Sequence, residues 1–133
     1  MFGQSQFSAS AYAQVGLQTQ VQTASPHQLI LLLFEGALSA MQIAMLHIES
    51  GDIPQKGKAI SQAIDIVTNG LKASLNTKAG GELAERLSAL YDYIVRRLLM
   101  ANLNNDLAAL TEAKALLEEI HSAWLEIKPQ VGG

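Results

Sequence analysis

The chain has 133 residues, a formal net charge of −3 at neutral pH, and no cysteine. Its length fits one domain, and its composition of 49% hydrophobic and 16% charged residues is sufficient for a buried core. The lack of cysteine excludes disulfides, thiolate zinc sites and thiol catalysis. The negative charge argues against nucleic-acid binding, because that function needs a basic surface.

Residues 1–22 are rich in Gln, Ser, Ala and Gly and carry only widely spaced apolar side chains. Such a segment lacks the contiguous apolar surface of a core element, so we predict that it is mobile, or weakly helical near Ala9–Val15. It shows no basic stretch followed by an apolar run, and secretion by signal cleavage is therefore not expected. Phe7 and Tyr12 are its candidate docking side chains.

The first helix is predicted over residues 26–50, with Ser25 as N-cap and Gly51 at the C-terminal end. It carries more apolar residues than one buried face needs. One stripe contains Ile30, Leu33, Phe34, Ala37, Met41, Ala44 and Ile48, and a second contains Leu29, Leu32, Gly36, Ala40 and Ile43. The second stripe requires another helix or a partner. Glu35, Gln42 and His47 interrupt the apolar run, so a membrane span of roughly 20 residues is not expected.

Three further helices are predicted over residues 55–75, 82–102 and 106–127, each with an apolar stripe at spacings of three and four. Residues 59, 66, 70 and 73 form a strip of mostly small side chains, which indicates a tight helix–helix contact or a partner site. Short links force neighbouring helices to run antiparallel. The sequence thus predicts an all-α, antiparallel up-down-up-down four-helix bundle over residues 23–128, with a short tail over 129–133.

No enzyme site emerges from the sequence. A di-iron bundle needs two Glu-x-x-His motifs, and only Glu118 and His121 form one, with Glu118 directed away from the apolar stripe. His47 lacks the nearby cation expected of a phosphotransfer histidine. No Gly-x-Ser-x-Gly turn occurs. We therefore expect no catalytic residue, no metal and no cofactor.

The predicted third helix carries a candidate binding flank. Four residues of types that are enriched at protein interfaces fall within a sector of about 60°: Arg86, Tyr93, Arg97 and Met100. A solvated flank with extended arginines is the alternative reading. Asp92 and Arg96, four residues apart, are expected to form a surface ion pair.

The surplus apolar residues also predict a groove, because a disordered amphipathic segment binds by folding as helices into such grooves. The candidate groove residues come from three helices: Leu32, Ile43, Ile66, Ala73, Tyr93 and Met100.

Several short motifs, in order along the chain, then give a resemblance. They are Ala11-Tyr12-Ala13-Gln14-Val15, the runs TASPHQLI at 23–30 and LFEGAL at 33–38, GDIP at 51–54, GGELA at 80–84, LYDYIVRRL at 90–98, Ala101-Asn102 and Trp124. Together they resemble FliS, the flagellin-specific export chaperone family. Phe34, where a tyrosine is common, and Leu83, where an isoleucine is common, are conservative departures.

The resemblance implies a cytoplasmic helical bundle that binds the disordered C-terminal segment of flagellin. Such binding would prevent premature polymerisation and bring flagellin to the flagellar type III export gate, without ATP or covalent chemistry. Tyr12, in the family-like AYAQV segment, would cover the empty groove and contact the export gate when displaced. A self-associating structural bundle, including a homodimer, and a phosphotransfer-type bundle domain remain open as alternatives.

Overall fold

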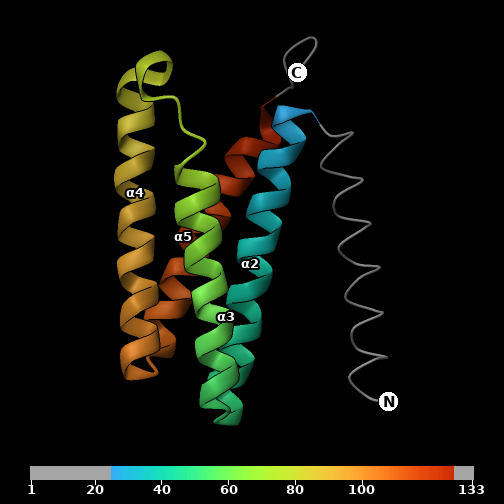
Figure 1. Ribbon diagram of the computed structural model, residues 1–133, viewed down its shortest axis with the longest axis vertical. Coiled ribbons are helices and arrows are strands. Elements are labelled where there is room, and N and C mark those ends of the chain that lie inside the picture. Colours follow the sequence, from blue (N-terminus) through green and yellow to red (C-terminus); the bar gives the residue numbers. More distant parts are fainter. Residues whose placement is uncertain (1–24, 128–133) are drawn as a thin grey trace. The chain divides into compact units, whose positions relative to one another are not determined.

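The computed structural model describes residues 25–127, except for the side chains of residues 77 and 78. Within this range the chain forms helices only (Figure 1). They are α2 (Pro26–Ser50), α3 (Ile53–Asp65), the π-helix η1 (Ile66–Lys72), α4 (Thr77–Asn104) and α5 (Leu107–Glu126). The all-α prediction is confirmed. The predictions for residues 1–22 and 129–133, with Phe7 and Tyr12, lie outside the described residues.

The chain divides into two compact units, and the bundle belongs to the unit Ile30–Lys128. Of the other unit, Met1–Leu29 with Pro129–Gly133, only residues 25–29 are described. Those residues contain the expected N-cap Ser25, which forms a capping box with Gln28. The Ser25 N–H donates to Gln28 Oε1 at 3.0 Å, and the Gln28 N–H donates to Ser25 Oγ at 3.2 Å.

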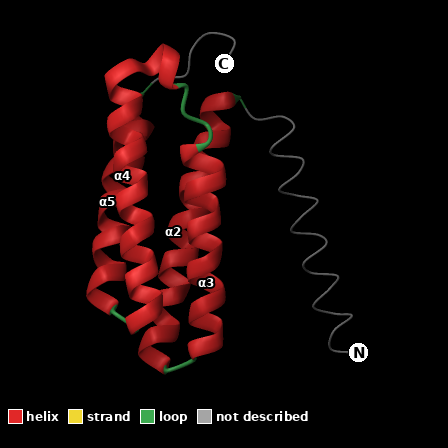
Figure 2. Ribbon diagram, turned by 60° about the vertical axis from the view of Figure 1, so that its left-hand side comes forward, coloured by secondary structure: helices red, strands yellow, loops and turns green. Residues whose placement is uncertain are grey.

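Successive helices of the bundle run in alternating directions, so the topology is up-down-up-down as predicted (Figures 1 and 2). α4 contacts α5 along its length and also packs on α3 and η1. The short links explain this arrangement, because a helix that follows a tight turn must return beside its predecessor.

Asx side chains start the later helices. Asp52, Asn76 and Asp106 accept hydrogen bonds from the N–H groups three residues on, at 3.2, 3.0 and 3.1 Å. Each bond satisfies one of the backbone donors that a helix start leaves without a partner. Asn105 ends α4 in the left-handed region with φ 52°, a conformation that asparagine tolerates.

The second helix differs from its prediction, because it begins at Ile53 and becomes a π-helix at Ile66. Val67, Leu71 and Leu75 follow one another at spacings of four, and each such step drifts by about 40° around a regular α-helix. In the π-helix, which has more residues per turn, the drift has the opposite sense. Val67 and Leu71 are both buried there.

The third helix also starts earlier than predicted, at Thr77. Gly81 nevertheless interrupts it with non-helical φ 54° and ψ −131°. Only glycine adopts this conformation readily, so the chain kinks at Gly81 after one short helical turn. The predicted start of the helix at residue 82 follows this kink.

The core contains the first stripe of α2. Phe34, Met41 and Ala44 are buried together with Ile94 and Leu98 of α4. Ala40 was assigned to the surplus stripe, but it is only 2% exposed and belongs to the core. Its short side chain lets it fit at the edge of the buried face.

The small-residue strip of the second helix is partly a tight internal contact. A Cβ atom on Gly70 would lie 3.0 Å from Leu33 Cδ2, and one on Gly36 would lie 3.4 Å from Ile66 Cδ1. α2 therefore approaches η1 closely where glycine leaves room.

Among the described helices, α2 alone is long and apolar enough to cross a membrane by length and composition. The interruptions at Glu35, Gln42 and His47 do not prevent this. One such helix is weak evidence, since a core helix of a globular domain meets the same criterion. Five of its side chains are buried in the bundle.

Candidate partner-binding surface

The completed core leaves large apolar side chains on the surface. Exposed ones occur toward the C-terminal end of α2, at the start of α3 and toward the C-terminal end of α4, which lie at the same end of the bundle (Figure 1). They are Ile43, Leu46, Ile53, Leu99, Met100 and Leu103. Leu83, Leu125 and Ile127 are exposed as well, near the start of α4 and the end of α5. Of the predicted surplus stripe of α2, only Ile43 is exposed, because Leu29, Leu32 and Gly36 are half-buried and Ala40 is buried.

The candidate groove residues divide into two groups by exposure. Ile43 and Met100 are 43% and 41% exposed, and Ala73 is also exposed. Leu32 and Tyr93 are half-buried. Ile66 is half-buried as well, and it packs against the core beside Gly36. Only the exposed group offers surface without rearrangement.

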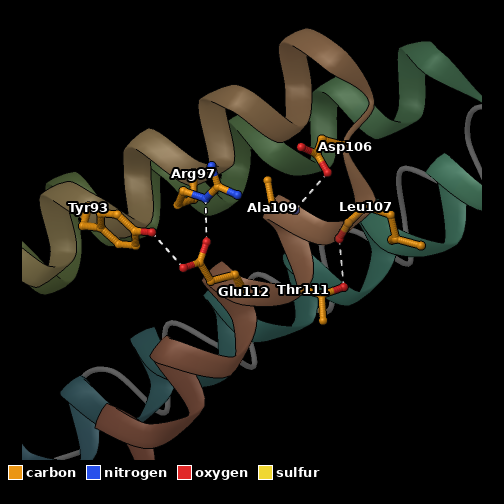
Figure 3. A network of polar contacts seen from close by, with 7 residues as sticks. All are labelled: Tyr93, Arg97, Asp106, Leu107, Ala109, Thr111 and Glu112. Carbon is orange, nitrogen blue, oxygen red and sulfur yellow. Dashed lines mark hydrogen bonds and ion pairs between the residues drawn. The ribbon is translucent and has the colours of Figure 1, made fainter.

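Tyr93 and Arg97 of α4 meet on one carboxylate of α5 (Figure 3). The Tyr93 hydroxyl donates to Glu112 Oε2 at 2.7 Å, and Arg97 Nε donates to Glu112 Oε1 at 2.6 Å. This clamp joins the two helices and fixes both side chains. Sequence reasoning selected Tyr93 and Arg97 but missed Glu112. Glu112 lies on α5, and the sequence does not show which side of α5 faces α4.

The clamp shifts the acidity of both its titratable partners. The hydrogen bond to Glu112, with some desolvation, raises the pKa of Tyr93, because ionisation would place a phenolate beside a carboxylate. The hydrogen bond from Tyr93, followed by that from Arg97, lowers the pKa of Glu112. Elsewhere in α4, burial alone raises the pKa of Tyr91 to about 12.

The other arginines of α4 have different surroundings. Arg86 Nη2 lies 2.5 Å from Glu82 Oε1, and both side chains are largely exposed. The Arg96 guanidinium lies 5.8 Å from the ring centroid of Tyr93. The predicted pair of Asp92 and Arg96 is wrong, because Asp92 Oδ1 instead binds Lys72 Nζ of η1 at 2.6 Å.

A buried lysine links α3 to the end of α4. Lys56 is only 3% exposed, and its Nζ donates to the carbonyl O and Oδ1 of Asn102 at 2.8 and 2.9 Å. Asn102 lies in the last turn of α4, where carbonyl groups lack helical partners and favour a cation. This contact fixes the helix end that carries Leu99 and Leu103.

The described residues offer no metal site, since they contain no group of three His, Cys, Asp or Glu side chains that could hold an ion. Glu118 is exposed as expected, and its carboxylate accepts from Lys114 Nζ at 3.3 Å. His121 stacks on the buried Phe34 ring, with centroids 5.3 Å apart. Its partner is thus an aromatic ring of the core.

Comparison with known proteins identifies the family. The model of the family described as flagellar protein FliS matches residues 8–131. The chain belongs to the FliS family. It is 54% identical over 120 residues to the flagellar secretion chaperone FliS of Salmonella typhimurium, which covers 90% of this chain and 89% of the relative.

More distant relatives agree. The flagellar secretion chaperone FliS of Escherichia coli K12 is 47% identical over 116 residues, covering 87% of this chain and 85% of its own. That of Bacillus subtilis is 35% identical over 107 residues, covering 80% and 78%. FliS is a family of chaperones and not of enzymes, so the sequence prediction of a non-enzymatic export chaperone is confirmed. Membership implies a partner among flagellar export substrates.

Proposed function

We propose that this FliS-family chaperone binds the disordered C-terminal segment of flagellin in the cytoplasm, prevents its premature polymerisation and delivers it to the flagellar export apparatus. The observation that carries the proposal is the apolar surface that remains after the core is complete. Ile43 and Met100 are exposed while their helices bury other apolar residues. In a family of secretion chaperones, an unfolded export substrate is the natural occupant of such a surface.

The energetics allow binding without nucleotide. Burial of about 1,000 Å² of apolar surface contributes on the order of 25 kcal/mol before other terms. Association and the ordering of a disordered segment offset most of that value. The remainder is sufficient for a stable complex, and release then depends on competition or transport.

The proposed contacts follow the exposure of the candidate residues. Ile43, Ala73 and Met100 contact the guest directly, and Leu32 and Tyr93 contribute their accessible parts. Arg86 and Arg97 lie beside Tyr93 and Met100 on α4 and contact polar groups of the guest. Ile66 requires displacement from Gly36 before it contributes.

The N-terminal segment has a separate proposed role. Phe7 and Tyr12 cover the empty binding surface, and Tyr12 contacts an export-gate component once flagellin displaces the segment. Removal of residues 1–20 is expected to leave folding intact and to tighten peptide binding. Weaker binding of the shortened chain would show that the segment assists the guest instead.

Isothermal titration calorimetry against a flagellin C-terminal peptide tests the proposal. We expect a complex at micromolar concentrations or tighter, and a scrambled peptide of the same composition should give no heat. Absence of binding by the intended peptide would reject flagellin as the guest. Sedimentation of the chain alone in the same buffer would then show whether it self-associates.

Two substitutions separate surface from core. Ile43→Asp is expected to keep the unfolding midpoint of the unsubstituted chain and to weaken peptide binding, because Ile43 is exposed. Ile66→Asp is expected to lower stability, because Ile66 packs against the core. Sequence analysis named Ile66 as a groove residue, and a substitution at such a surface position would have left the fold intact. Equal binding by Ile43→Asp would exclude that residue from the contact.

A further inference from the structure

The solvent side of α4 carries a second helical stripe that the core does not use. Ala89, Tyr93, Arg96, Met100 and Leu103 follow one another at spacings of four, three, four and three. An average spacing of 3.5 residues is that of a seam where two helices pair side by side. We call these five residues the outer seam.

The outer seam is accessible over its whole length. Ala89 and Arg96 are exposed, Tyr93 is half-buried, and Met100 and Leu103 are 41% and 78% exposed. Other helices already cover the opposite face of α4, where Ile94 and Leu98 are fully buried. A pairing helix on this side must therefore come from outside the described bundle.

Positive charge lies at the centre of the outer seam. Within residues 25–127 the Arg96 guanidinium has no ion pair, and its described contact is the face of the Tyr93 ring. Arg97 next to it binds Glu112 through Nε only. Two acidic groups beside Tyr93 have other partners, since Glu112 binds Tyr93 and Arg97 and Asp92 binds Lys72.

This charge decides which kind of helix fits. Two copies of the chain paired through the centre of this stripe would place one Arg96 against the other, and like charges brought together in an interface are costly. A helix with a carboxylate at the matching position gains a charge-assisted hydrogen bond instead. The surface thus favours an acidic partner over a second copy.

The bundle also holds the outer seam in place before a partner arrives. Glu112 fixes the Tyr93 side chain through its hydroxyl (Figure 3). The Tyr93 ring in turn supports the Arg96 guanidinium. Lys56 holds Asn102, the residue beside Leu103. Because these side chains are already ordered, less conformational freedom is lost when a helix docks.

We propose that the outer seam docks one amphipathic helix that places apolar side chains on Met100 and Leu103 and a carboxylate on the Arg96 guanidinium. This inference rests on the proposed function, since the helix is a part of the flagellin C-terminal segment that folds on binding. It adds a chemical requirement to that function: the segment must carry an acidic residue within its apolar helical face.

Charge reversal in the full-length chain tests the inference by calorimetry with the flagellin C-terminal peptide. Arg96→Glu is expected to weaken binding roughly tenfold or more, because attraction becomes repulsion at the centre of the contact. Lys58→Glu on α3 makes the same change of charge away from the stripe and is expected to bind like the unsubstituted chain. Higher salt should weaken the unsubstituted complex more than that of Arg96→Gln.

Leucine substitutions test the apolar half. Leu103→Ser is expected to weaken binding, whereas Leu125→Ser on α5 should not. Thermal unfolding of each variant provides the folding control, and we expect unchanged midpoints because both side chains are exposed. A matching pair of variants in the peptide, each with one acidic residue changed to its amide, identifies the carboxylate that Arg96 contacts.

The outcomes separate the inference from the proposed function. If the unsubstituted chain binds the peptide and both Arg96→Glu and Leu103→Ser bind equally well, the outer seam is not the docking site, and flagellin binding stands. If the unsubstituted chain does not bind, the proposed function fails and the inference fails with it. A homodimer that Leu103→Ser dissociates would assign this surface to a second copy and overturn the inference.

Discussion

The two faces of α4 carry similar residue types but differ in role: one packs in the core and the other faces solvent. The inner face buries Tyr91, Ile94 and Leu98, while the outer face leaves Tyr93 half-buried and exposes Met100 and Leu103. What distinguishes them is coverage by neighbouring helices and the arginines that accompany only the outer face. The inner face therefore determines stability, and the outer face remains available for binding.

A pair of leucine substitutions tests this contrast with the largest expected effect. Leu98→Ala should lower the free energy of unfolding by about 2–5 kcal/mol, because it leaves a cavity in the core. Leu103→Ala should change it by less than about 0.5 kcal/mol. Urea denaturation of both variants provides the measurement. Equal losses would show that the outer face is structural in the free chain.

The buried amine at the end of α4 should give the next largest effect. Lys56→Ala removes two charge-assisted hydrogen bonds to Asn102 and should cost about 1–3 kcal/mol of stability. Lys58→Ala, an exposed lysine on the same helix, is the matched control and should be nearly neutral. A neutral result for Lys56→Ala would mean that the outer face does not depend on this contact.

Alanine substitutions at Gly57 and Gly70 test how closely the helices pack at each position. Gly57→Ala should stabilise the chain by about 0.5–1 kcal/mol, because alanine favours a helix and the new Cβ lies 3.7 Å from Asn102 Oδ1. Gly70→Ala should not stabilise the chain, because the new Cβ would lie 3.0 Å from Leu33 Cδ2 and this close contact offsets the gain in helix propensity. Thermal unfolding compares the pair. Equal gains would show that Leu33 moves aside freely.

The smallest effect concerns the clamp between α4 and α5. Glu112→Gln should return the pKa of Tyr93 toward its ordinary value, because the neighbouring negative charge is lost. Absorbance titration of tyrosinate should show this change, while the pKa of Tyr91 stays at about 12. An unchanged titration of Tyr93 would mean that the clamp is open in solution.

The same clamp stabilises the fold in a pH-dependent way through two groups, Glu112 and Tyr93. The lowered pKa of Glu112 gives stabilisation that is present above its ordinary pKa and disappears as pH falls through the lowered value. The raised pKa of Tyr93 gives stabilisation that is present below its ordinary pKa and disappears as pH rises through the raised value. Glu112→Gln should therefore flatten the stability profile at both ends of the pH range.

The fold could be predicted from the sequence because its signals are local. Ser25, Gly51 and Asp106 mark helix boundaries by their own chemistry, and the apolar stripes give the buried faces. The π-helix Ile66–Lys72 was not predicted, since a spacing of four fits a short α-helix nearly as well. Ala40 was misplaced because alanine fits either side of a stripe boundary.

The candidate site was less predictable because its contacts join distant segments. Tyr93 and Arg97 could be selected by residue type and helical position. Their common partner Glu112 could not be, because the rotation of α5 against α4 is set by packing. The same reason explains why Asp92 binds Lys72 instead of Arg96.

The heat capacity change on binding a flagellin C-terminal peptide tests most directly whether the exposed apolar side chains are a guest-binding surface. Calorimetry over a range of temperatures measures it. Burial of about 1,000 Å² of apolar surface predicts a change of about −0.45 kcal/mol/K before polar contributions. A complex whose binding enthalpy does not vary with temperature, or no complex at all, would contradict the account.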